Sequence, residues 1–102
     1  MTHSTHAYAQ DPRNETILID INGTHFPRSE AKVSVFDSGF VLGDGVWEGL
    51  RAHKGPDGKG VIAFLDSHLE RLYDGTKTLD FEMPVSKQAL TDRLYNLSLI
   101  HI

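Results

Sequence analysis

The amino-acid sequence predicts an α+β domain, an antiparallel sheet of hairpins with two helices on one side. Between residues 17 and 64, short runs of apolar and β-branched residues alternate with turn-forming residues, which is typical of hairpins. After residue 64, apolar residues recur at helical spacing over two separate stretches. The chain has 102 residues, a length that suits one small domain burying only ~60–65% of its unfolded surface.

The first hairpin is predicted at residues 17–26. Isoleucine recurs at every second position from residue 17 to residue 21, which is the period of a strand. Asn22-Gly23 follows, and this dipeptide suits a type I′ turn because both residues tolerate positive φ. Residues 24–26 then form the return strand. The polar residues 1–16 show no apolar periodicity, so we expect them to form a flexible tail.

A glycine-punctuated segment follows the first hairpin. Residues 33–36, Val-Ser-Val-Phe, are a short run of β-forming residues and are expected to be a strand. Gly43-Asp44-Gly45 fits a tight turn, and it lacks the flanking pattern of a phosphate-binding loop. We expect Asp37 and Asp44 to brace this turn by accepting hydrogen bonds from nearby backbone amides.

A second hairpin is predicted from residue 46 to residue 64, with a turn at residues 55–60. The first strand, residues 46–53, has two faces because side chains alternate sides along a strand. One face carries Trp47, Gly49 and Arg51, and the other carries Val46, Glu48, Leu50 and Ala52. The first face suits a small amphipathic ligand, with tryptophan as an apolar wall and arginine as an anion partner. The alternative, which spacing alone favours, is an exposed sheet face whose tryptophan packs against the domain's own helix.

Two helices complete the predicted domain. The first begins near a capping box formed by Ser67 and Glu70, with Asp66 as an alternative cap. Its apolar stripe at helical spacing consists of Leu65, Leu69, Leu72, Tyr73 and Thr76. The second helix begins at residues 84–86, and its apolar face consists of Leu90, Leu94 and Leu97. The chain ends inside this helix, so we expect a truncated domain.

Composition excludes several classes of function. The formal net charge of −4 gives no reason to expect nucleic acid or an anionic membrane surface as a partner. No cysteine is present, so disulfide frameworks and thiolate metal sites are excluded, and the six histidines fit no zinc spacing. No apolar run approaches the ~20 residues of a membrane span. We therefore expect a cytoplasmic protein without a metal site.

Two motifs carry a family resemblance. Residues 35–51 read Val-Phe-Asp-Ser-Gly-Phe-Val-Leu-Gly-Asp-Gly-Val-Trp-Glu-Gly-Leu-Arg, and residues 68–72 read His-Leu-Glu-Arg-Leu. Together they resemble the small N-terminal domain of the class IV (fold-type IV) aminotransferases, which use pyridoxal 5′-phosphate. The resemblance covers about residues 17–97, and Val-Trp-Glu-Gly-Leu-Arg is most similar to the branched-chain aminotransferases.

The resemblance implies roles for five residues. It implies that Arg71 binds the cofactor phosphate, and that side chains at Leu42, Trp47 and Gly49 line the substrate pocket. Arg51 matches a position that suits a substrate carboxylate. Spacing alone also allows Arg71 to be a surface arginine paired with Glu70 or Asp74. His68, one helical turn before Arg71, is expected to support that arginine.

The family's catalytic Schiff-base lysine has no match in this chain. The five lysines lie in solvated contexts, whereas such a lysine must be buried enough to be a free amine. We therefore expect residues 17–102 to be a small domain whose larger, lysine-bearing partner domain is missing, and which is inactive alone. An orphan domain without catalysis is the alternative.

The resemblance also implies a reaction for the whole enzyme. The whole enzyme is expected to be a homodimer that transfers an amino group between an amino acid and a 2-oxo acid. Branched-chain amino acids are the favoured substrates, because the motif is most similar to that of the branched-chain aminotransferases. Related activities on the same fold remain open. D-amino acid transaminases share Gly-Asp-Gly-Val-aromatic-Glu, and aminodeoxychorismate lyases usually lack a glutamate at the position of Glu48.

Overall fold

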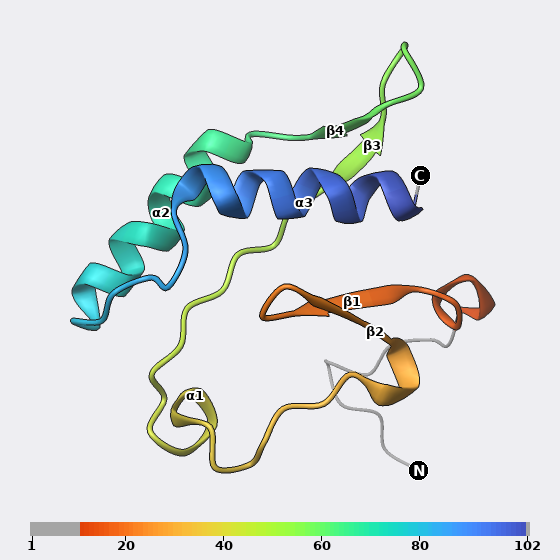
Figure 1. The fold of residues 1–102 in the computed structure, drawn as a ribbon. Helices are drawn as coiled ribbons and strands as arrows, with labels where there is room; N and C mark the ends of the chain where they lie inside the picture. The colour runs from red at the N-terminus through yellow and green to blue at the C-terminus, as the bar shows by residue number, and fades with distance from the viewer. Residues whose placement is uncertain (1–10, 102) are drawn as a thin grey trace, which may run out of the picture. The chain divides into compact units, whose positions relative to one another are not determined.

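The computed structural model describes residues 11–101, which divide into two compact units, one ending at Lys32 and the other beginning at Val33. Each unit contains one antiparallel two-stranded sheet, and the second unit contains the helices α1, α2 and α3 (Figure 1). The α+β class is thus confirmed. The hairpins form two separate sheets, because each strand pairs only with its neighbour along the chain in the part that is described.

The first unit is built around the predicted hairpin. Strand β1 (Leu18–Ile21) pairs with β2 (Thr24–Pro27), and Ile21 opposes Thr24, which leaves a two-residue loop. Asn22 and Gly23 have φ values of 54° and 86°, as a type I′ turn requires. Short 3₁₀ turns flank the hairpin, η1 (Pro12–Asn14) and η2 (Arg28–Glu30). Of the predicted tail, residues 1–10 lie outside the described residues.

The second unit carries a shorter hairpin than the sequence predicts. Strand β3 (Ala52–Lys54) pairs with β4 (Gly60–Ile62), and residues 46–51 are extended without belonging to a sheet. The pairing ends there because the segment that follows β4 turns away from residues 46–51. Beyond β4, the amide of Ala63 still donates to the carbonyl of Arg51 at 2.9 Å, but Phe64 turns into the left-handed region at φ 54°.

The strand predicted at residues 33–36 is wrong. Val33, Val35 and Phe36 are exposed, and no described strand pairs with them. Ser34 turns the backbone away from extended pairing, because its hydroxyl accepts from the amide of Phe36 and its carbonyl accepts from the amide of Asp37. Strand propensity without a pairing partner is insufficient to form a strand here.

A short helix that the sequence did not predict follows at α1 (Ser38–Val41). Asp37 caps it by accepting a hydrogen bond from the amide of Gly39 at 2.8 Å. Gly43, at φ +74°, reverses the chain after the helix, and the amide of Gly45 donates to its carbonyl at 2.9 Å. The glycine turn is confirmed, but its bracing by Asp37 and Asp44 is wrong: Asp37 caps α1 instead, and among the described residues the turn is held by backbone hydrogen bonds.

Helix α2 (Leu65–Thr78) begins earlier than predicted. The capping box is wrong: the residue before the helix is Phe64, without a side-chain cap, and its carbonyl accepts from the amide of His68 at 3.1 Å. Leu65 is buried and belongs inside the helix, which places Ser67 within the first turn instead of before it. The predicted apolar stripe is confirmed, since Leu65, Leu69 and Thr76 are its most buried members.

The core of the second unit lies between β4, α2 and α3 (Lys87–His101). Its buried residues are Ile62, Leu65 and Leu69, and packed against them are Leu50, Leu72, Leu90 and Leu94. The predicted leucine face of α3 is therefore confirmed for Leu90 and Leu94. Ser86 precedes α3, and its hydroxyl accepts from the amide of Ala89 at 3.0 Å, which satisfies one of the free amides of the first turn. Figure 1 shows α3 alongside β4.

Candidate functional site

Arg71 and Glu48 form a two-point ion pair. Nε of Arg71 donates to Oε1 of Glu48 at 2.7 Å, and Nη2 donates to Oε2 at 3.0 Å. This geometry matches the planar fork of a guanidinium to both oxygens of one carboxylate, which makes it stronger and more directional than a single contact. The alternative that Arg71 pairs with Glu70 or Asp74 is therefore wrong as to the partner, since its carboxylate partner comes from the segment before β3.

His68 joins the same carboxylate. Its Nδ1 lies 3.1 Å from Oε1 of Glu48, and because an ionised carboxylate only accepts, Nδ1 carries the proton. His68 and Arg71 are three residues apart on α2, so both side chains face the same side of the helix. His68 thus contacts Glu48, which in turn holds Arg71, and this arrangement agrees with the predicted supporting role.

The extended segment 46–50 positions Glu48 against α2. Leu50 packs on the core, while Val46 lies against Gly75 of α2. A Cβ atom at Gly75 would lie 3.0 Å from Cγ1 of Val46, so the glycine permits a close approach of the two segments. Glu48 lies between these two anchors, and its side chain is only 11% exposed.

The cluster changes the acidity of its members. Hydrogen bonds from Arg71 hold the pKa of Glu48 below its usual range; partial burial opposes this shift, and the hydrogen bond from His68 adds to it. The same contacts raise the pKa of Arg71. Glu48 is therefore ionised and Arg71 is cationic across the physiological pH range.

One edge of the Arg71 guanidinium remains available. Glu48 occupies Nε and Nη2, the lateral edge, and Nη1 has no hydrogen-bond partner among the described residues. The Arg71 side chain is 73% exposed. A pocket of about 310 Å³ lies beside it, lined by Ser67, His68 and Arg71. The hydroxyl and the guanidinium around this hollow are donors that fit a phosphate group, while the imidazole uses its Nδ1 proton on Glu48.

Of the residues expected to line a substrate pocket, Trp47, Gly49 and Arg51 alternate with Glu48 along the segment, and Leu42 lies before it, at the end of α1. Trp47 is 85% exposed, and Leu42, Gly49 and Arg51 are exposed too. The Trp47 ring lies over Gly49, since a Cβ atom there would be 3.7 Å from Cζ3. Arg51 has no ion-pair partner in the described part of the chain. Alternation thus separates Trp47, Gly49 and Arg51 from Glu48, although residues 46–51 are not in a sheet.

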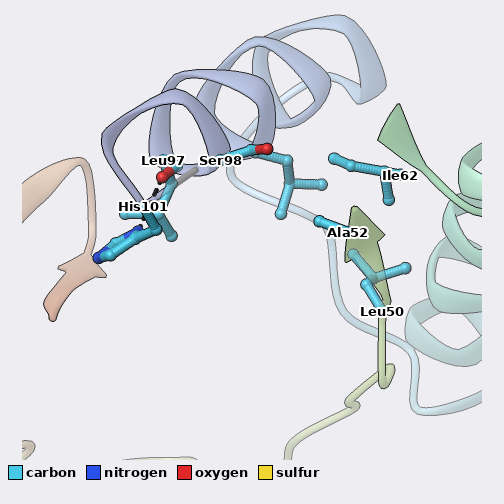
Figure 2. Close-up of a pocket in the computed structure, with 7 residues that line it drawn as sticks. Leu50, Ala52, Ile62, Leu97, Ser98 and His101 are labelled. Atoms are coloured by element: carbon cyan, nitrogen blue, oxygen red, sulfur yellow. Dashed lines mark hydrogen bonds between the residues drawn. The ribbon is translucent and has the colours of Figure 1, made fainter. Parts of the chain in front are cut away.

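A second hollow is apolar and lies between the hairpin and the end of α3 (Figure 2). It measures about 310 Å³, and its lining is Leu50, Ala52, Ile62, Leu94, Leu97, Ser98 and His101. Figure 2 shows His101 directed back to its own helix, where Nδ1 donates to the carbonyl of Leu97 at 2.8 Å. None of the residues predicted for the site lines this hollow.

The lysines of the chain lie at its surface. Each of Lys32, Lys54, Lys59, Lys77 and Lys87 is exposed. A Schiff-base lysine needs burial, and the absence of that role from these five stays a prediction. Within residues 11–101, no group of three or more His, Cys, Asp or Glu side chains is arranged to hold a metal ion. None of the described helices has the length and apolar character to cross a bilayer.

Glu48 is the site residue that the sequence reasoning missed. The strand alternation put it on the face opposite Trp47 and Arg51, but nothing in that pattern named Arg71 as its partner. A usable signal is present: Val46 and Leu50 flank it at i−2 and i+2 and are partly buried. A carboxylate between two inward-facing apolar residues favours a cation or a hydrogen-bond donor on the element it packs against.

Comparison with known proteins identifies relatives over most of the chain. A putative branched-chain-amino-acid aminotransferase of Methanocaldococcus jannaschii is 43% identical over 74 residues, which is 72% of this chain and 24% of that protein. The branched-chain-amino-acid aminotransferase-like protein 1 of Arabidopsis thaliana is 39% identical over 84 residues, 82% of this chain and 14% of that protein. The aminodeoxychorismate lyase of Bacillus subtilis is 36% identical over 80 residues, 78% of this chain and 26% of the relative.

A D-alanine aminotransferase of Bacillus licheniformis is also similar, at 33% identity over 76 residues, 74% of this chain and 25% of that protein. No family model matches the chain. The chain thus spans about a quarter or less of the length of these curated relatives.

Proposed function

Since this chain belongs to the class IV aminotransferase family, we propose that it forms the phosphate-binding side of a pyridoxal 5′-phosphate site. The observation that carries this proposal is Arg71, which is held at one edge by Glu48 and open at the other edge beside Ser67 and His68. A phosphate ester carries nearly two negative charges and binds well to such a fork.

The residues of the chain divide the work of binding. Arg71 binds the phosphate, Ser67 donates from the pocket wall, and Glu48, which also accepts from His68, keeps Arg71 in place. When bound, the cofactor supplies an electron sink for bond breaking at the substrate's α-carbon. Leu42, Trp47 and Gly49 provide the apolar wall of the substrate side, and Arg51 binds the substrate carboxylate.

We propose an amino-group transfer between a branched-chain amino acid and a 2-oxo acid as the activity of the whole enzyme. The 43% and 39% identities to proteins named as branched-chain aminotransferases support this choice. A D-amino acid transaminase is the second candidate, because the 33% identical relative bears the name D-alanine aminotransferase. Lyase activity ranks third. The enzyme is proposed to be a cytoplasmic homodimer.

Phosphate binding is tested on the chain itself with pyridoxamine 5′-phosphate, which has no aldehyde and forms no adducts with surface lysines. Isothermal titration would compare the wild type with Arg71→Gln and with Lys77→Gln, an exposed cation on the same helix. Losing charge-assisted hydrogen bonds worth about 1.5–3 kcal/mol predicts roughly 10- to 100-fold weaker binding by Arg71→Gln alone. An equal loss of affinity in Arg71→Gln and Lys77→Gln would show that binding depends on net charge and not on Arg71.

Substrate choice is tested with a chimera. This chain would replace the matching 74-residue segment of the Methanocaldococcus relative, so that the relative supplies the remainder. Transfer from leucine, isoleucine or valine is the expected activity. Activity on D-alanine alone would contradict the branched-chain assignment and favour the second candidate.

A further inference from the structure

We propose that Glu48 is a positioning residue that directs the terminal Nη1–Nη2 edge of Arg71 toward the phosphate. This inference rests on the proposed function, because it concerns how the same arginine meets its ligand. A guanidinium has five N–H groups in a fixed plane. Glu48 takes one from Nε and one from Nη2. The three that remain are both N–H groups of Nη1 and the second one of Nη2, and two of these form the terminal edge.

Burial makes Glu48 suitable for this role. Its side chain is 11% exposed, whereas that of Arg71 is 73% exposed. The partly buried carboxylate is fixed by Val46 and Leu50 on either side, while an exposed arginine alone samples many rotamers. Glu48 therefore acts as the fixed point, and the mobile cation takes its orientation from it.

His68 strengthens the fixed point. Its Nδ1 donates to Oε1 of Glu48, the oxygen that also accepts from Nε of Arg71. Two donors on one oxygen fix the carboxylate against rotation about its last bond, so that both of its oxygens stay in the plane of the guanidinium. This leaves Nε2 of His68 available at the pocket that Ser67, His68 and Arg71 line.

Two physical effects of Glu48 oppose one another. Its negative charge repels a phosphate, and removing it would tighten binding. Its hold on Arg71 saves the cost of immobilising a flexible side chain, about 0.5–1.5 kcal/mol, and removing it would weaken binding roughly 2- to 12-fold. Arg71 is 73% exposed, so this repulsion acts through water, whose high dielectric constant weakens it, and we expect the positioning effect to be the larger one.

Glu70 offers a matched control for charge. It is the neighbour of Arg71 on α2, it is exposed, and Arg71 makes its ion pair with Glu48 instead. Glu70→Gln therefore removes the same charge near Arg71 without removing a hydrogen bond to it. Glu48→Gln removes the charge and one strong acceptor but retains an amide oxygen. Glu48→Ala removes both acceptors.

The experiment measures pyridoxamine 5′-phosphate binding by these variants at about 0.15 M salt, together with the ¹⁵N NMR signal of the Arg71 Nε–H group. We expect roughly 2- to 12-fold weaker binding by Glu48→Ala, a smaller loss for Glu48→Gln, and none for Glu70→Gln. The Nε–H proton should exchange slowly with water in the wild type and Glu70→Gln, and quickly in Glu48→Ala.

The outcomes separate this inference from the proposed function. If Arg71→Gln weakens binding but Glu48→Ala binds as tightly as the wild type or more tightly, the positioning role is wrong and phosphate binding stands. If Arg71→Gln binds like the wild type, the phosphate assignment itself fails. Partial rescue by Glu48→Gln distinguishes positioning from a general loss of folding, and the NMR signal reports Arg71 directly.

Discussion

The two sides of residues 46–51 differ in how completely the chain supplies their partners. On one side, Glu48 has Arg71 and His68, and Leu50 has the core. On the other side, Trp47 and Arg51 face solvent. The difference teaches that this chain assembles the phosphate end of the proposed site from its own residues. The proposed substrate end needs side chains from elsewhere to enclose it.

Leu69→Ala tests the core on which the Glu48 side of residues 46–51 packs, and it should cause the largest loss of stability. Leu69 is 4% exposed and lies in the core between α2 and its neighbours. Removing a buried leucine costs about 2–5 kcal/mol of the free energy of unfolding, which is a large part of the stability of a small domain. Urea unfolding followed by circular dichroism measures the loss. Leu99→Ala, on an exposed position of α3, should change stability by about 0.5 kcal/mol or less.

Lowering the pH should remove the stability that the ion pair between Glu48 and Arg71 contributes. Because Arg71 lowers the pKa of Glu48 in the folded chain, this pair stabilises the fold above the unfolded-state pKa of about 4.3. That stabilisation is lost as the pH falls through the lower, folded-state pKa. The urea midpoint measured from about pH 6 downward should fall more steeply for the wild type than for Glu48→Gln. Parallel curves would show that the ion pair contributes nothing measurable.

Trp47→Ala tests the second side and should have the smallest effect on stability. A side chain that is 85% exposed buries little apolar surface, so the free energy of unfolding should change by about 0.5 kcal/mol or less. Solubility should rise, because a large exposed apolar group is removed. A loss above about 1 kcal/mol would show that Trp47 packs within the chain, and the contrast between the two sides would disappear.

Local rules predicted much of the fold. Asn22-Gly23 defined its hairpin, because positive φ at both turn residues leaves few alternatives. The stripe on α2 followed from helical period alone. Residues 33–36 failed because strand formation depends on a partner, which no local pattern specifies. The start of α2 failed because burial of Leu65 outweighed the capping preference of Ser67.

The site was predictable in part. Sequence pattern and family resemblance named Arg71, and alternation separated Glu48 from Trp47. The contact between Glu48 and Arg71 joins residues 23 positions apart, and it depends on Gly75 admitting Val46 against α2. Such an approach between distant segments follows from packing, which periodicity does not encode. The roles of Leu42, Trp47, Gly49 and Arg51 stay predictions.

The most direct test of the central claim is the affinity of the chain for pyridoxamine 5′-phosphate with and without the guanidinium of Arg71. The phosphate assignment predicts that Arg71→Gln binds roughly 10- to 100-fold more weakly than the wild type, while Lys77→Gln binds like the wild type. Equal affinity of the wild type and Arg71→Gln would contradict it, and Arg71 would then be only the ion-pair partner of Glu48.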